Sequence, residues 1–401
     1  INTIRINNMT QNSVVILAAR RTPIGSMLGA FATVAAPALG ATALRAAIAS
    51  AGADPATIDE VVMGCVLPAG QGQAPARQAA IAAGVPISVP ATTVNKMCGS
   101  GMKAVMLAAD QIAAGGASLV LAGGMESMTC APYLLLKARA GYRMGHGEVI
   151  DHMFYDGLQS PWDGKLMGCF ADATAAKYGF TRADQDAFAA ESVRRALAAV
   201  GSKAFETEIA AVTVADRKGE RIVAQDETPF SVSIEKIPNL KPAFAKDGTV
   251  TAASSSSIAD GAAALLLASP QAAAGAGLKP IARIVAHASF AHAPEWFTTA
   301  PAGAIARVLK QAGWRADDVD LFEVNEAFAV VTMASMKDIG IPHERVNVNG
   351  GACALGHPIG ATGARIMTTL LHALIKRGKK RGVAALCIGG GEATAIAVEI
   401  A

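Results

Sequence analysis

The chain lacks any long apolar run and any strong excess of charge of one sign. Its 401 residues carry a formal net charge of only +3. The longest strongly apolar runs, such as GAAALLLASP, are far shorter than the ~20 residues that a membrane-spanning helix needs. We therefore expect neither a nucleic-acid partner nor a membrane location. With 52% hydrophobic and 17% charged residues, the composition is that of a globular chain with a large core.

Cysteine motifs that bind metals or form disulfide frameworks are also missing. The six cysteines stand at positions 65, 98, 130, 169, 353 and 387, none of them forms C-x-x-C, and no Cys/His pair has zinc-finger spacing. We therefore expect no metal site and free thiols, which indicates a cytoplasmic protein. No signal peptide is visible at the start of the sequence. Residues 1–8 precede Met9 and are interpreted as a cloning remnant or an optional leader.

Two stretches, residues 41–64 and 302–325, share one layout. Each predicts an amphipathic helix that ends at Ala-Gly, a short turn, and an Asp that leads into an apolar strand. Gly52 matches Gly313 at an offset of 313 − 52 = 261, and the Asp seven residues later keeps that offset. Further along, TTVNKMCGSG is echoed by VNVNGGACALGHPIGATG, and ASLVLAGGMES by GVAALCIGGGEAT. Coincidence among alanine-rich helices is the alternative, but the common motif order favours a duplicated α/β unit.

Residues 129–251 differ from both halves in composition. They carry more charge, most of the aromatic residues, and loop-forming sequences such as DGLQSPWDGK and DETPF. We interpret them as an insertion into the first half, which resumes at the apolar sequence SIADGAAALLLAS. The predicted domains are therefore residues 9–128 together with 252–279, the inserted residues 129–251, and the second half at 280–401.

Cys98 stands where an extended run turns into a helical one. PATTV precedes the motif NKMCGSG, and MKAVMLAADQIAAGG follows it. A thiol at a helix N-terminus lies at the positive end of the helix dipole, which favours the thiolate and lowers the pKa below ~8.5. Gly99 and Gly101 would let substrate and backbone approach closely. Cys98 is thus a candidate nucleophile, and the alternative is a buried cysteine that acts as a small hydrophobe.

The same segment has a rival interpretation. GSGMKA, residues 99–104, formally fits the dinucleotide-binding pattern G-x-G-x-x-G/A, and Glu126 lies near the expected acidic position. That fingerprint usually marks the first strand–helix turn of a unit, whereas this one follows an earlier helix–strand pair. It also leaves Cys98 and the second half unexplained, so we favour the nucleophile.

Three further candidates stand at turns or strand ends of the second half. Of the seven histidines, only His357 lies in the glycine-rich turn before the second-half helix, GHPIGATG, which is the nearest counterpart of the Cys98 turn. If the halves pack with pseudo-twofold symmetry, a base comes to lie beside the thiol. Cys387 in CIGGGEA ends a strand where the first half has Ala122, and Asn325 in EVNEAFA interrupts an apolar strand end. The alternatives are a capping or core histidine, a buried cysteine, and a capping Asn beside a paired Glu.

Together these motifs resemble one known family. NKMCGSG, GGMESM, NEAFA, NGGACALGHPIGATGAR and CIGGGEA occur here in the order found in the thiolase family, and the resemblance extends over the chain from Met9 onward. It implies an α/β fold with two duplicated core domains in a layered αβαβα arrangement and an inserted loop domain that binds coenzyme A. Because family members are dimers or tetramers, it also implies self-association, and we expect a homotetramer built as a dimer of dimers.

The resemblance assigns a role to each candidate. Cys98 would carry the acyl group as a thioester, and His357 would accept its proton. Cys387 would act as acid and base at the α-carbon of the second acetyl-CoA. Asn325 would hold a water that forms one oxyanion hole with His357, and the backbone N–H groups of Cys98 and Gly389 would form the other. Two preorganised holes suit a Claisen condensation, which passes through an enolate and a tetrahedral oxyanion.

Coenzyme A contacts also follow from the resemblance. Ser256 in TAASSSSIADG would lie near the pantetheine, and Phe244 in LKPAF would pack on it. Leu166 and Met167 stand where short-chain biosynthetic relatives often have His-Met, and the absence of that histidine, which faces the coenzyme or substrate in them, counts against a preference for acetoacetyl-CoA. Phe230 in DETPF stands where relatives often carry an arginine near the adenine, so stacking would replace charge there.

The implied activity is an acyl transfer, 2 acetyl-CoA ⇌ acetoacetyl-CoA + CoA (EC 2.3.1.9). Acetyl-CoA, acetoacetyl-CoA and CoA would be substrates, and no cofactor is expected. One alternative is a 3-ketoacyl-CoA thiolase of broader or longer chain length (EC 2.3.1.16). Another is a decarboxylating ketoacyl synthase, which would place a histidine where this chain has Cys387. The last is a non-catalytic acyl-CoA or lipid-binding relative, which would tend to lose the nucleophile.

Overall fold

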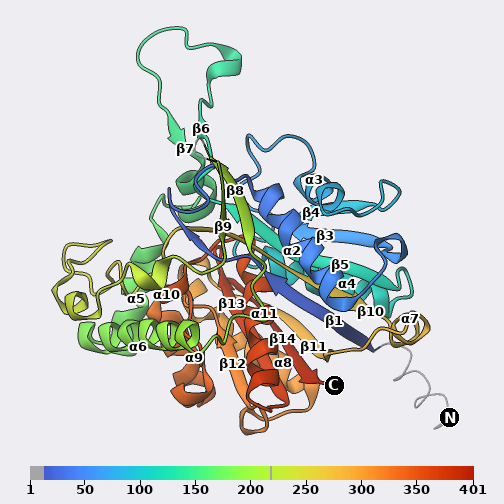
Figure 1. Cartoon of the computed structure of the whole chain (residues 1–401). Coiled ribbons are helices and arrows are strands. Elements are labelled where there is room, and N and C mark those ends of the chain that lie inside the picture. Colours follow the sequence, from blue (N-terminus) through green and yellow to red (C-terminus); the bar gives the residue numbers. More distant parts are fainter. Residues whose placement is uncertain (1–12, 217–218) are drawn as a thin grey trace.

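One long mixed sheet runs through the molecule, and both halves of the chain contribute to it (Figure 1). The computed structural model describes residues 13–216 and 219–401, so residues 1–8 lie outside the described part. The first-half strands follow the order β4-β3-β5-β10-β1, the second-half strands the order β11-β14-β13-β12, and antiparallel pairing of β1 with β11 joins them. The strands are β1 (Val14–Arg21), β3 (Glu60–Gly64), β4 (Ala91–Val94), β5 (Leu119–Ser127), β10 (Ala259–Ala268), β11 (Ala282–Ala291), β12 (Leu321–Val324), β13 (Arg381–Ile388) and β14 (Glu392–Ile400), with the short β2 (Gly25–Ser26) beside β10.

The strands of the two halves pair in the same way. β3 runs parallel to β5 as β12 runs parallel to β13, and β5 is antiparallel to β10 as β13 is to β14. Asp59 accepts hydrogen bonds from the backbone N–H groups of residues 118 and 119. Asp320 accepts the equivalent bonds from residues 380 and 381. The two aspartates therefore begin equivalent strands, and the predicted duplication is confirmed.

The helices before these aspartates also end alike. α2 (Ala36–Ala51) ends at Gly52, with φ 67°, and α8 (Ala300–Ala312) ends at Gly313, with φ 68°. In both, the residue after the glycine donates its N–H back into the last helical turn, as in a Schellman motif. The left-handed conformation explains why glycine stands at both positions, since a Cβ atom disfavours it.

Helices divide the molecule into five layers (Figure 1). α2 covers the outer face of the first-half strands, and α8 covers the outer face of the second-half strands. α4 (Ser100–Ala113) and α11 (Thr362–Lys376) pack together between the two halves. A separate buried apolar cluster fills the space on the α2 side, between the halves, and on the α8 side. The predicted αβαβα fold is therefore confirmed. Smaller helices complete the layers: α3 (Pro75–Ala82), α7 (Pro270–Gly275), α9 (Ala329–Ile339) and α10 (Ala352–Leu355).

The chain between β5 and β10 leaves the sheet and then returns to it. It forms β6 (Tyr133–Leu134), β7 (Ile150–Asp151), α5 (Met167–Tyr178), α6 (Arg182–Gly201), β8 (Val212–Asp216) and β9 (Gly219–Val223). β6 and β7 form the base of an arm that projects from the body (Figure 1). The boundaries of the three predicted domains stay a prediction, because one sheet continues through both halves. Among the helices of the described part, none is both long and apolar enough to cross a membrane.

Candidate active site

A cavity of about 370 Å³ lies where the two halves meet the inserted segment. Its wall combines the turn before α4, the end of β13, the glycine-rich turn before α11, and the start of α5. Eight of the ten predicted site residues line it, whereas Asn325 and Phe230 do not. The eight are Cys98, Leu166, Met167, Phe244, Ser256, His357, Cys387 and Gly389.

Cys98 lies in the tight turn between β4 and α4. The preceding Met97 has φ 48°, a left-handed conformation that is strained for a residue with a Cβ atom. The side-chain oxygen of Asn95 accepts the N–H of Met97 at 2.9 Å. The Ser100 hydroxyl donates to the Met97 carbonyl at 2.6 Å. These two bonds hold the strained turn and present the thiol to the cavity.

The Cys98 thiol rests protonated, contrary to the expectation from the helix dipole. Burial raises the pKa of Cys98 to about 11, although the backbone N–H groups of Gly389 and of Cys98 itself act in the opposite direction. Removal from water outweighs the amide dipoles, because charge is costly in a site closed off by protein. The same two N–H groups point at the sulfur, which is the geometry of an oxyanion hole for a group bound to it.

His357 is oriented by its own turn. The imidazole Nδ1 lies 2.6 Å from the Thr362 hydroxyl, which in turn donates to the Pro358 carbonyl at 2.9 Å. Because that hydroxyl donates its hydrogen bond to the carbonyl, it can only accept from the imidazole. Nδ1 must therefore carry the hydrogen, and Nε2 is left as an acceptor. Nε2 has no partner among the described residues. Burial, followed by the charge of Arg365, lowers the pKa of His357 to about 3, so the ring is a neutral base.

Cys387 lies near the end of β13, one residue before Ile388. Burial raises its pKa well above the ordinary value, and the neighbouring Cys98 adds to the effect. The expectation that Ala122 is its first-half counterpart is wrong. Residue 60 pairs with 120 and residue 321 pairs with 382, so the offset at this strand is 382 − 120 = 262 and Cys387 matches Met125. The thiol is thus specific to the second half, and it stands at the cavity.

Asn325 and Glu326, which follow β12, differ in their hydrogen bonding. Glu326 is buried and accepts hydrogen bonds from Ser192, Asn347 and the N–H of Cys353, so it is a structural residue. Asn325 is 1% exposed, yet neither polar atom of its side-chain amide has a partner in the described part of the chain. A buried amide in this state needs water or a ligand. Asn325 therefore has unused hydrogen-bonding capacity, although it does not line the cavity.

The coenzyme side of the cavity is apolar. Phe244 packs edge-on against Phe328, with ring centroids 5.8 Å apart, and a Cβ atom at Gly168 would collide with the Phe244 ring. Leu166 precedes α5 and Met167 begins it. Ser256 donates both its N–H and its hydroxyl to the Ala327 carbonyl at 3.0 Å. No motif in the sequence points to the other apolar residues of the wall, which are Met128, Phe154, Leu158, Ile258, Phe297, Phe328 and Ile359.

Phe230 lies away from the cavity. Its side chain is 59% exposed, and the short helical turn Thr228–Phe230 packs against α6 and α10. A contact with the adenine therefore stays a prediction that the position of Phe230 does not support.

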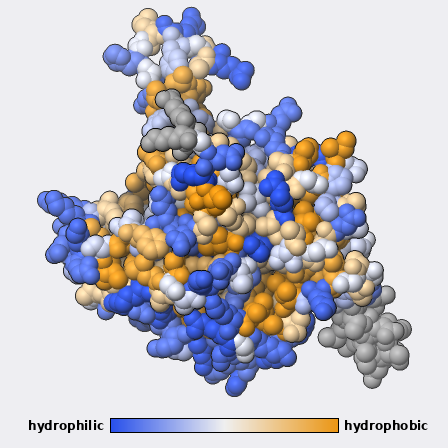
Figure 2. Space-filling model, in the orientation of Figure 1, coloured by the Kyte–Doolittle hydropathy of each residue, from blue (hydrophilic) through white to orange (hydrophobic). Residues whose placement is uncertain are grey.

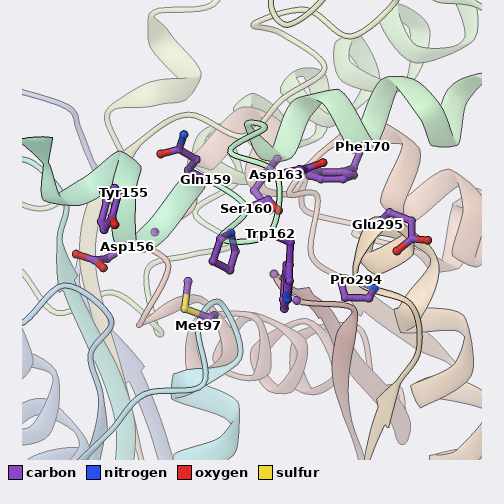
Figure 3. Close-up of a pocket in the computed structure, with 15 residues that line it drawn as sticks. Met97, Tyr155, Asp156, Gln159, Ser160, Trp162, Asp163, Phe170, Pro294 and Glu295 are labelled. Atoms are coloured by element: carbon purple, nitrogen blue, oxygen red, sulfur yellow. The ribbon is translucent and has the colours of Figure 1, made fainter.

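A second cavity of about 570 Å³ adjoins the first (Figure 3). The two share Gly157, Met167 and Gly389, and Met97 beside the nucleophile faces the second one. Trp162 and Tyr155 stand on its wall with several polar side chains (Figure 3). This space was not expected from the sequence, because it depends on how the inserted segment folds back over β13.

The described residues contain no group of three or more His, Cys, Asp or Glu side chains arranged to hold a metal ion. All six cysteines are free. The expected absence of a cofactor stays a prediction.

Comparison with known proteins identifies the family. Residues 14–271 match the thiolase N-terminal domain and residues 278–400 match the thiolase C-terminal domain. The chain belongs to the thiolase family. Thiolases are acyltransferases, so the prediction of an acyltransferase enzyme is confirmed. The dinucleotide-binding interpretation of GSGMKA is accordingly set aside.

Individual relatives cover nearly the whole of this thiolase. An acetyl-CoA acetyltransferase of Escherichia coli is 50% identical over 387 residues, which are 96% of this chain and 98% of that protein. One from Pseudomonas aeruginosa is 49% identical over 385 residues, with the same shares of the two chains. The crystal structure of the Bacillus anthracis acetyl-CoA acetyltransferase superposes with a TM-score of 0.95 at 40% identity, covering 98% of this chain and all of that one.

Proposed function

We propose that this thiolase catalyses the reversible condensation of two acetyl-CoA molecules to acetoacetyl-CoA and CoA through an acyl-enzyme on Cys98. The observation that carries the proposal is the meeting of Cys98, His357, Cys387 and the Gly389 N–H at one cavity. The names of the similar proteins from three bacteria agree with it. A non-catalytic acyl-CoA binder would have no need of two thiols and a neutral imidazole at one site.

In the first half-reaction, the Cys98 sulfur attacks the thioester carbonyl while its proton passes to Nε2 of His357. The N–H groups of Cys98 and Gly389 stabilise the oxyanion. The tetrahedral adduct collapses and the C–S bond to coenzyme A breaks. The departing CoA thiolate takes the proton of Cys387 and leaves as a thiol. The enzyme then holds an acetyl thioester on Cys98, an imidazolium and a Cys387 thiolate, and no proton is unaccounted for.

In the second half-reaction, the Cys387 thiolate removes an α-proton from a second acetyl-CoA. Imidazolium at His357 and a water held by Asn325 stabilise the enolate oxygen. The enolate carbon attacks the acetyl group on Cys98, the new C–C bond forms, and the Cα–acyl adduct releases the Cys98 thiolate. That thiolate recovers its proton from His357. All three groups return to their neutral resting forms, as covalent ping-pong catalysis requires.

A 3-ketoacyl-CoA thiolase of longer chain length is the second candidate. The cavity in Figure 3 favours it, because this space begins at Met97 and Gly389, beside the carbonyl that Cys98 would carry. Thiolytic kcat/KM values with acetoacetyl-CoA and 3-ketooctanoyl-CoA separate the two candidates. We expect acetoacetyl-CoA to have the higher value, and the opposite order would transfer the assignment to the longer-chain enzyme.

We also propose that the chain forms a homotetramer in the cytoplasm. The arm between β6 and β7 supports self-association, since its apolar side chains are exposed and Met144 is 95% exposed. Figure 2 shows apolar surface along the lower part of this arm. Exposed apolar clusters of this kind usually mark an interface. The six free cysteines are in keeping with a reducing compartment.

A further inference from the structure

Glu126, at the end of β5, is completely buried, yet it does not line the cavity and has no ion-pair partner among the described residues. We propose that Glu126 is a positioning residue of this thiolase, whose single carboxylate holds the Cys98 turn and the His357 turn in register. The proposal rests on the proposed function, since it concerns the alignment of that nucleophile with that base.

The carboxylate of Glu126 binds backbone from both halves of the chain. Oε2 accepts the N–H groups of Val66 and Gly360, each at 2.9 Å. Oε1 accepts the N–H of Leu67 at 3.2 Å and faces the Cys65 thiol at 3.6 Å. Val66 and Leu67 follow β3 in the first half, whereas Gly360 belongs to the turn that carries His357. One side chain therefore connects the two halves of the chain.

A short series of hydrogen bonds leads from Glu126 to the nucleophile. The Leu67 N–H that Glu126 accepts and the Val66 carbonyl belong to the same peptide unit, and that carbonyl accepts a hydrogen bond from the side-chain amide of Asn95 at 3.3 Å. The Asn95 side-chain oxygen accepts the N–H of Met97 at 2.9 Å. Met97 is the strained residue directly before Cys98. Glu126 thus supports the turn that orients the Cys98 thiol.

A second series leads from Glu126 to the base. Thr362 lies two residues after Gly360, and its hydroxyl orients the His357 ring. The turn sits directly on the first half, because a Cβ atom at Gly124 or Gly101 would meet the Gly360 carbonyl oxygen. A Cβ atom at Gly360 would in turn meet the Glu126 carboxylate. Glycines thus let the His357 turn pack directly against the first half of the chain. The hydrogen bond from the Gly360 N–H to Glu126 then sets the position of that turn.

The charge of Glu126 gives a readout that a purely structural side chain would lack. Burial raises its pKa to about 7, although the three backbone N–H groups oppose the shift. The titratable groups that face it are the thiols of Cys65 and Cys98, and its negative charge contributes to the raised pKa of Cys98. Removing the charge should therefore make the Cys98 thiol easier to ionise, while loss of the bonds should make the site less active.

The test is Glu126→Gln in the full-length enzyme. If the Gln oxygen accepts the N–H groups of Val66 and Gly360, its amide N–H₂ must face the N–H of Leu67. Two donors then oppose each other, so the Leu67 backbone or the Gly360 turn must shift. We expect kcat for thiolysis of acetoacetyl-CoA to fall about 10–100-fold with KM within about twofold, because misplacement of about 1 Å has this cost and Glu126 does not line the cavity. The pH at half-maximal alkylation of Cys98 by iodoacetamide should move to a lower value.

Two further variants separate position from charge. Glu126→Asp keeps the charge but cannot reach all three N–H groups, so kcat should fall while the alkylation profile stays in place. Asp59→Asn is the matched control, because Asp59 also accepts two backbone N–H groups but lies at the opposite end of β5. We expect it to leave both kcat and the alkylation profile unchanged.

Three results would overturn the proposal. One is a kcat within twofold of wild type in Glu126→Gln, or in Glu126→Asp should the first variant not fold. Another is an equal fall of kcat in Asp59→Asn. The last is an unmoved alkylation profile in Glu126→Gln. Alkylation needs no substrate, so this last result counts even if the wild type has no thiolase activity. Absence of thiolase activity in the folded wild type would contradict the proposed function separately.

Discussion

Both the proposed nucleophile and the proposed base of this thiolase rest uncharged. Burial raises the pKa of the Cys98 thiol to about 11 and lowers that of His357 to about 3. Desolvation disfavours whichever form carries charge, so it acts in opposite directions on an acid and on a cationic base. The proton must therefore move as the sulfur attacks, and a preformed thiolate–imidazolium pair is not the resting state.

The first prediction concerns the ionisation of Cys98. Its rate of alkylation by iodoacetamide should rise about tenfold per pH unit from pH 7 to 10, since only the thiolate reacts. The half-maximal rate should fall near pH 11. Peptide mass spectrometry reads the modification of Cys98, with the exposed Cys130 as an internal reference. A plateau for Cys98 between pH 7 and 9 would contradict the neutral resting state.

The second prediction concerns the tautomer of His357. Thr362→Val removes the hydroxyl that keeps the hydrogen on Nδ1, so the ring can rotate or exchange its tautomer. We expect kcat to fall about 10-fold, the scale at which a lost orienting bond weakens a histidine ligand or base.

Thr368→Val is the matched control for that change. Thr368 is also buried on α11, but its hydroxyl donates to the Ala364 carbonyl and does not touch the imidazole. Equal kcat losses in the two variants would show that a buried hydroxyl on α11, and not the orientation of His357, is what matters.

At the scale of elements, the site depends on glycines that allow two turns to touch. Gly101 was expected to let substrate and backbone approach closely, and the structure shows a close approach of backbone. A Cβ atom there would meet the carbonyl oxygens of Gly360 and Ala361 at 3.0 and 3.1 Å. The His357 turn thus packs directly against Gly101, and it also packs against Gly124 on β5.

The third prediction follows from the contact between Gly124 and the His357 turn. Gly124→Ala places a methyl group against the Gly360 carbonyl, so the turn must move away. We expect a loss of about 1–3 kcal/mol in the free energy of unfolding, and at least a tenfold loss of kcat. Urea unfolding and the thiolysis assay measure the two effects.

Gly201→Ala at the end of α6 is the control, since a Cβ atom there meets nothing within 4 Å. It should change neither quantity appreciably. Wild-type activity in Gly124→Ala would mean that the His357 turn does not depend on this contact.

Helix ends and strand starts were predictable from the sequence where a few neighbouring residues determine them. The two helix ends at Gly52 and Gly313 and the aspartates that follow them carry such signals in a few neighbouring residues. The pairing of β1 with β11 carries no such signal, because it joins strands from different halves without a turn between them. The Ala122 assignment failed for a related reason, since strand register depends on partners far away in the chain.

At the scale of the whole molecule, the cavity is assembled from segments far apart in the sequence. The motifs pointed to Cys98, His357 and Cys387, which line the cavity, because Cys and His in turns and at strand ends are conspicuous. The apolar walls, such as Phe154 and Phe297, were not predictable, because an apolar residue in a loop looks the same whether it lines a cavity or fills a core. The pKa of Cys98 was mispredicted for the same reason, since burial is a property of the assembled fold.

The fourth prediction concerns the arm. Replacing Leu135 and Leu136 together by Ser removes exposed apolar surface without disturbing the core. We expect the molar mass in solution, measured by light scattering, to fall from the value of a tetramer toward that of a dimer. An unchanged mass with unchanged dissociation on dilution would exclude the arm from the interface.

The measurement that tests the central claim most directly is mass spectrometry of the enzyme after rapid acid quenching with acetoacetyl-CoA. We expect a mass increase of one acetyl group on the peptide that contains Cys98. The adduct should be absent in Cys98→Ala and present in Cys130→Ala, which removes an exposed thiol away from the cavity. No adduct on Cys98 in folded wild-type protein, or an adduct that persists in Cys98→Ala, would contradict the cysteine acyl-enzyme.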